Sequence, residues 1–116
     1  MKAIVWRGDE QQLRGLGREI ITLIGRLCEQ SKGDDLVDMI TLAALIEIRN
    51  RVAQRCLLVG QRRYLISFSV QEAIALVVVR HDGLVPVVPG SALLWIADEA
   101  DRLITGNWPL YLKRML

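Results

Sequence analysis

Residues 64–79 read YLISFSVQEAIALVVV, and this stretch contains the clearest folding signal in the chain. Ser69 and Glu72 form an S-x-x-E capping box directly before an apolar run, which predicts a helix over residues 70–81. Before the box, residues 64–68 have strand-like composition, with Tyr64, Ile66 and Phe68 alternating with Leu65 and Ser67. The stretch therefore predicts a strand over 64–68 that leads straight into a helix.

The remaining segments are mostly helical in pattern. Apolar residues recur at spacings of three and four over residues 10–30, where Asp9 is a suitable N-cap, and further helices are expected over 35–59 and 92–105. The first half of the segment 35–59, LVDMITLAALIEI, is apolar on most sides, so we expect that helix to be central and packed on several faces. Residues 2–6, KAIVW, have strand-like composition and are a candidate partner for 64–68, although two strands alone make a marginal sheet.

The fold expected from these elements is a mostly α, compact bundle of about four helices, in one domain over residues 1–116. Whether residues 2–6 and 64–68 pair as a small two-stranded β element is left open by the sequence. The chain is 52% hydrophobic and has nine glycines, so its apolar share exceeds the usual 45–50%. Such an excess indicates either a rich core or an apolar surface that binds something.

Overall charge and composition exclude few functions. The formal net charge is +2 with 24% charged residues, which favours neither nucleic acid nor an acidic partner. Charged residues interrupt the first twenty positions, and two prolines interrupt the longest uncharged run, so we expect no signal peptide and no contact with a membrane. Cys28 and Cys56 lie in apolar helical patterns and are expected as buried thiols of a cytoplasmic protein, with a disulfide between them left open.

No convincing catalytic, cofactor or metal motif is present, and we expect the protein not to be an enzyme. His81, the only histidine, falls at the end of a predicted helix, where the helix dipole favours a cation. Asp34, Asp35 and Asp38 suit the start of a helix better than a hard-cation site, which needs several convergent oxygens.

An arginine ridge is the one anomaly in the charge pattern, since no acidic residue lies between Glu47 and Glu72. Arginine suits phosphate because its planar fork binds two oxygens at once, and Tyr64 and Phe68 are the nearby aromatic side chains for base stacking. The alternative is favourable charge near a helix C-terminus that also keeps an apolar protein soluble. The possible anion or nucleic-acid contacts are Arg49, Arg51, Arg55, Arg62 and Arg63.

The last third of the chain contains apolar segments that a four-helix core has little room to bury. We expect a homo-oligomer, most simply a dimer, although these segments can instead wrap the protein's own helices. The expected function is a non-enzymatic helical interaction or assembly protein that self-associates. The alternative is an accessory nucleic-acid-binding protein that uses the arginine ridge. The residues expected at an oligomer interface are Val85, Val87, Val88, Trp95 and Trp108.

Overall fold

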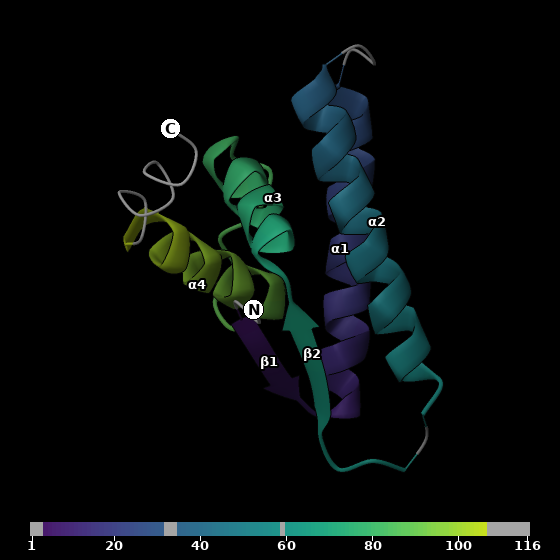
Figure 1. Ribbon diagram of the computed structural model, residues 1–116. Helices are drawn as coiled ribbons and strands as arrows, with labels where there is room; N and C mark the ends of the chain where they lie inside the picture. The colour runs from purple at the N-terminus through teal and green to yellow at the C-terminus, as the bar shows by residue number, and fades with distance from the viewer. Residues whose placement is uncertain (1–3, 32–34, 59, 107–116) are drawn as a thin grey trace.

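The computed structural model describes residues 4–31, 35–58 and 60–106. Over these ranges the chain is mostly helical, with a small antiparallel sheet, which confirms the predicted fold class (Figure 1). The predicted helix boundaries agree closely with those observed, except that the second helix ends at Cys56 rather than near residue 59. The elements are β1 (Ile4–Gly8), α1 (Glu10–Gln30), α2 (Leu36–Cys56), β2 (Tyr64–Phe68), α3 (Val70–His81) and α4 (Ala92–Gly106).

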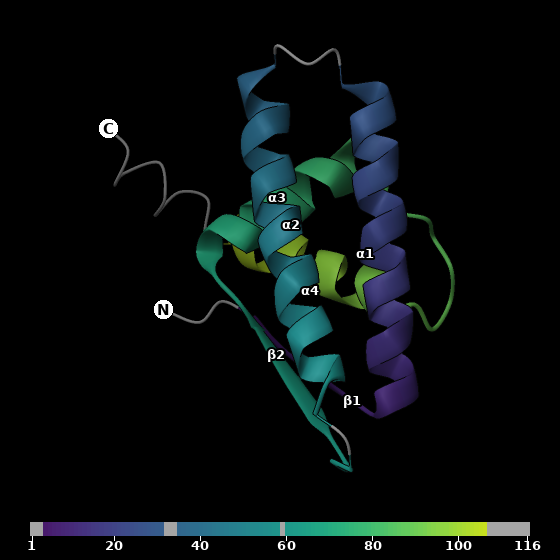
Figure 2. The same ribbon diagram turned by 90° about the vertical axis from the view of Figure 1, so that its right-hand side faces the viewer.

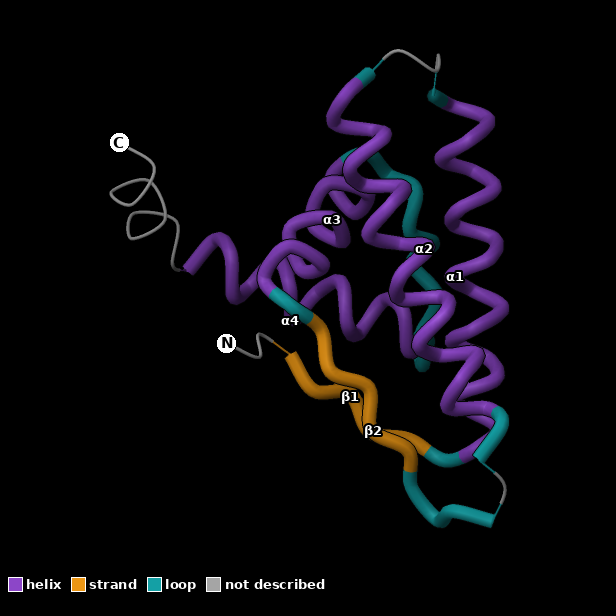
Figure 3. Tube along the Cα trace, turned by 45° about the vertical axis from the view of Figure 1, so that its right-hand side comes forward, coloured by secondary structure: helices purple, strands orange, loops and turns teal. Residues whose placement is uncertain are grey.

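The two strands pair antiparallel, with Ile4 opposite Phe68 and Gly8 opposite Tyr64 (Figure 3). Residues 2 and 3 of the predicted first strand lie outside the described residues. Alternate positions of both strands are buried, as the pattern at 64–68 predicts, because successive side chains point to opposite faces of a sheet. The buried face belongs to the core, and the other face is exposed.

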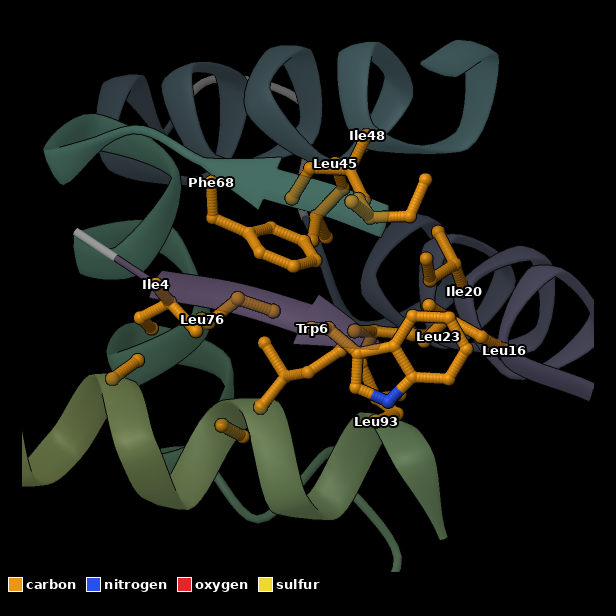
Figure 4. Close-up of a cluster of buried hydrophobic side chains, with 14 of the residues drawn as sticks. Ile4, Trp6, Leu16, Ile20, Leu23, Leu45, Ile48, Phe68, Leu76 and Leu93 are labelled. Carbon is orange, nitrogen blue, oxygen red and sulfur yellow. The ribbon is translucent and has the colours of Figure 1, made fainter. Parts of the chain in front are cut away.

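The core lies between two helix pairs and the sheet. The α1–α2 hairpin lies on one side, while α3 and α4 lie on the other (Figures 1 and 2). Trp6 extends from β1 into the space between α1 and α4, and Phe68 lies above it toward α2 (Figure 4). A Cβ atom on Gly8 would lie 2.4 Å from Cη2 of Trp6, so the indole ring can occupy this position only because residue 8 is glycine.

Capping boxes start two of the helices. At α1, Asp9 Oδ1 accepts a hydrogen bond from the Gln12 N–H at 2.8 Å, and Gln12 Oε1 accepts one from the Asp9 N–H. At α3, Ser69 Oγ accepts from the Glu72 N–H at 3.2 Å, and Glu72 Oε1 accepts from the Ser69 N–H at 2.8 Å. Each box satisfies two donors that a helix start leaves without intrahelical partners, and the predicted box at 69–72 is confirmed.

The prediction that α2 is packed by several neighbours holds beyond its first turns, but those first turns are exposed. α2 contacts α1, α3 and β2, but its first turns extend beyond α3 and α4, together with the end of α1 (Figures 1 and 2). Nothing in the described chain covers the outward side chains there. Leu36, Val37, Met39 and Ile40 are 67%, 54%, 56% and 62% exposed.

The cap at α3 predicts a measurable stability difference. Ser69→Ala removes the hydroxyl that accepts the Glu72 N–H and should lower the free energy of unfolding by about 1 kcal/mol. Ser67→Ala is the matched control, because the Ser67 side chain has no hydrogen-bond partner among the described residues, and its effect should stay within about 0.5 kcal/mol. Urea titrations measure both. Equal effects of the two changes would contradict a specific role for the Ser69 hydroxyl.

Candidate interaction surfaces

One member of the predicted arginine ridge has an acidic partner in the structure. The Arg51 side chain extends from α2 toward α3, where its Nη2 donates to both carboxylate oxygens of Glu72, at 2.7 and 2.8 Å. Glu72 is only 4% exposed, and the Arg51 guanidinium also lies 6.0 Å from the centre of the Phe68 ring. The ridge contains no acidic residue in the sequence, but Glu72 neutralises one of its members, Arg51, in the folded chain.

The other four arginines remain near the surface. Arg49 donates a hydrogen bond to the side chain of its neighbour Asn50, and within the described ranges Arg55, Arg62 and Arg63 are exposed and form no ion pair. Tyr64 and Phe68 are each 1% exposed, and the Tyr64 hydroxyl donates to the carbonyl of Leu58. These two rings therefore cannot stack on bases, which corrects the expectation that they support the arginines.

His81 has a structural partner. Its Nε2 lies 2.9 Å from Oδ1 of Asp101, and one residue earlier Arg80 Nε donates to Asp98 at 2.9 Å. These two pairs join the end of α3 to α4. The hydrogen bond from His81, with another from Thr105, lowers the pKa of the Asp101 carboxyl from its usual value.

The remaining candidates for chemistry are not brought together. Asp35 caps α2 by accepting a hydrogen bond from the Val37 N–H, while Asp34 lies outside the described residues. Among the residues that the structure describes, no group of three metal-ligating side chains is found. Cys28 and Cys56 are both free thiols, and Cys28 is exposed, so the expectation that both are buried is wrong for Cys28.

Two surfaces have the character of binding sites. The first, which we call the α2 face, consists of the exposed aliphatic side chains at Leu36, Val37, Met39 and Ile40, all within the first five residues of the helix. Asp38 is the single charged residue among them. Scattered exposed apolar residues are ordinary, but a contiguous apolar group at a protruding helix end is typical of an interface.

The second surface is a groove in two adjoining parts, which share Gly15, Glu19, Gly90 and Ser91. At the shared point the Ser91 hydroxyl donates to the Glu19 carboxylate, joining α1 to the start of α4. The part next to β1, which we call the β1 cleft, measures about 810 Å³, and the other part about 450 Å³. The β1 cleft is lined in addition by Val5, Trp6, Arg7, Gln12, Ala92, Leu94, Trp95 and Asp98. The smaller part is lined in addition by Arg18, Thr22, Leu23, Arg26, Pro86, Val88, Pro89 and Leu93.

The residues expected at an oligomer interface divide between different places. Val85 is 4% exposed and belongs to the core, so its assignment to the surface is wrong: the loop turns this one side chain inward. Val87 is 74% exposed, Val88 lines the smaller part of the groove, and Trp95 lines the β1 cleft. Trp108 lies outside the described residues. Two of the five predicted interface residues, Val88 and Trp95, thus line a concave groove, which apolar composition alone does not reveal.

The Arg51–Glu72 pair predicts strong energetic coupling between α2 and α3. In a double-mutant cycle of Arg51→Met and Glu72→Gln, the coupling free energy should be about 1–3 kcal/mol, because the carboxylate is desolvated. The control cycle uses Arg14 and Glu10, whose ion pair is exposed, and should give at most about 0.5 kcal/mol. Coupling at Arg51–Glu72 no larger than in the control would contradict the structural role of this pair.

The lowered pKa of Asp101 predicts a pH-dependent contribution to stability. A carboxyl whose pKa is lower in the folded chain stabilises the fold above its unfolded pKa, and this stability disappears as the pH falls through the folded pKa. The difference in unfolding free energy between wild type and Asp101→Asn should therefore shrink between about pH 5.5 and pH 2.5. Glu29→Gln, an exposed α1 control, should show a small difference throughout. A constant Asp101→Asn difference across this range would contradict the assignment.

Comparisons with known proteins add no functional information. No protein-family model matches the chain, and no curated protein or solved structure is significantly similar to it. Among the described residues, none of the helices is long and apolar enough to cross a membrane.

Proposed function

We propose that this protein is a non-enzymatic interaction module that self-associates through the α2 face. The observation that carries the proposal is the exposure of four large aliphatic side chains within residues 36–40. Fully burying one such side chain contributes about 1.5–3 kcal/mol, so covering the α2 face supplies a substantial driving force. A cytoplasmic location belongs to the same proposal, because the exposed thiol of Cys28 suits a reducing compartment.

A second copy of the chain is the occupant that best fits this face. The face lies at a protruding helix end (Figure 1) and has Asp38 as its single charged residue, and such a surface can pack against its own copy around a two-fold axis. Two hairpins packed in this way would cover the first turns of α2 in both copies. The groove that contains Val88 and Trp95 does not fit this role. On a two-fold axis a concave surface faces its own concave copy, and two such surfaces make little contact.

The arginines give weaker support to the alternative function of nucleic-acid binding. Arg51 has a buried carboxylate partner, and both aromatic rings near the ridge are in the core. Phosphate binding by the remaining arginines would depend on charge alone. It would therefore weaken steeply with salt, which makes it easy to distinguish from apolar self-association.

Sedimentation equilibrium at micromolar concentration tests the proposal. The wild type should sediment at twice the monomer mass of 13.1 kDa. Ile40→Asp places a charge in the centre of the α2 face and should give the monomer mass with unchanged helical circular dichroism, since this side chain is exposed in the isolated chain.

Val87→Asp is the matched control, because Val87 is even more exposed but lies far from α2 in the sequence and outside the α2 face. This variant should remain dimeric. A wild-type protein that is monomeric at every concentration would refute self-association. If Val87→Asp dissociates the dimer and Ile40→Asp does not, the interface lies at the loop before α4 and not at the α2 face.

A further inference from the structure

The β1 cleft runs along the free edge of the sheet. Val5 and Arg7 point to one face of β1 and Trp6 points to the other, yet all three line the same cleft. A cavity that meets three consecutive residues of a strand meets the strand along its edge. The opposite edge of β1 is paired with β2, and no residue of β2 lines the cleft.

This edge has unused backbone hydrogen-bonding groups. In a two-stranded sheet each strand directs only half of its N–H and C=O groups to its neighbour. Within the described residues, Ile4–Gly8 make no backbone hydrogen bond apart from those to β2. An unpaired strand edge is a template for another extended chain, and here a cleft of about 810 Å³ lies beside it.

Trp6 adds to the same wall a side-chain donor that has no partner among the described residues. The residue is 5% exposed, but its indole N–H donates no hydrogen bond to any described residue. The only side-chain polar atom found sealed from solvent without a partner, among described residues, is Nε of Arg51. The Trp6 N–H therefore remains reachable, and the cleft is the cavity that Trp6 lines.

Arginines outnumber carboxylates along the groove. The carboxylate of Asp98 is paired with Arg80, whereas that of Glu19 accepts the neutral Ser91 hydroxyl and keeps its negative charge. Arg7 in the β1 cleft and Arg18 in the adjoining part are exposed, and neither guanidinium has a partner in the described ranges. Trp95 and Leu94 provide apolar contact area opposite the strand.

We propose that the β1 cleft binds an extended peptide segment of a partner protein, in which apolar side chains alternate with acidic ones. The segment adds a third strand to the sheet at β1, a mode in which backbone hydrogen bonds give affinity and pockets for alternate side chains give specificity. Its apolar side chains lie against Trp95 and Leu94, its carboxylates face Arg7 and Arg18, and one backbone carbonyl accepts the Trp6 N–H.

A second copy of this chain fits the cleft poorly. β1 is walled by α1 and the first half of α4 on the side of the cleft, so two copies joined through their β1 edges would bring these walls against each other. A single extended strand is narrow enough to enter. The charge argument also points away from a second β1, because that strand would bring another Arg7 rather than an acid.

Isothermal titration calorimetry with designed peptides tests this inference. The probe is a blocked seven-residue peptide in which valine alternates with threonine and aspartate. A second peptide has asparagine in place of aspartate, and a third has methylated backbone nitrogens at alternate residues, made in both registers. The aspartate peptide should bind, and the asparagine peptide should bind about tenfold more weakly because the charged hydrogen bonds are lost. At least one methylated register should not bind at all.

Protein variants locate the site. Arg7→Gln should weaken binding of the aspartate peptide about tenfold and leave binding of the asparagine peptide unchanged. Arg62→Gln makes the same change of charge outside the groove and should have no effect. Peptide binding should quench or shift the tryptophan emission of the wild type. In Trp95→Leu the part of this change that comes from Trp95 should be absent, and only the change from the other tryptophans should remain.

Three results would overturn the proposal: no binding of the aspartate peptide at millimolar concentration, binding that tolerates methylation in both registers, or equal losses in Arg7→Gln and Arg62→Gln. The titrations are repeated in the Ile40→Asp background. Peptide binding there should be unchanged, so failure of self-association and failure of the cleft are seen separately.

Discussion

The contact between Arg51 and Glu72 is the point on which the arrangement of the two helix pairs depends. The Glu72 carboxylate completes the capping box of α3 and, with both oxygens, accepts the Arg51 guanidinium from α2. The same guanidinium faces the ring of Phe68, the last residue of β2. One carboxylate thus fixes where the strand ends, where the helix begins and how the hairpin docks on both. Buried ion pairs stabilise little relative to apolar packing, but loss of one partner leaves an uncompensated buried charge and is strongly destabilising.

The local structure follows from local signals, and for this reason most of the fold could be predicted from sequence. Capping boxes at Asp9 and Ser69 act over three residues, and the alternation at 64–68 fixes both the strand and its buried face. A strand over 2–6 and its pairing with 64–68 were open possibilities because β-forming composition alone does not choose a partner. Burial of Trp6, Ile66 and Phe68 against the helices decides the pairing.

The surfaces were harder to predict because they depend on contacts between distant segments. Arg51 and Glu72 lie 21 residues apart, and no periodicity indicates that they meet. The apolar first half of α2 was expected inside the protein because apolar composition cannot distinguish a core from an interface. No sequence pattern indicated that one edge of β1 is unpaired, since this depends on which segments of the folded chain pack beside the strand. Val85 and Val88 have the same chemistry, and only the path of the loop separates the buried one from the exposed one.

The protruding end of the hairpin has a consequence for how the protein resists unfolding. Along α2, the buried positions Thr41, Leu45, Ile48 and Val52 hold the helix to the rest of the chain, and nothing comparable holds the turn that precedes them. The cost of opening the helix therefore rises from Leu36 toward Val52, since local stability follows burial. Any partner that covers residues 36–40 would complete the fold of this end as it binds. For this part of the chain, folding and assembly would be one equilibrium, set by protein concentration as much as by sequence.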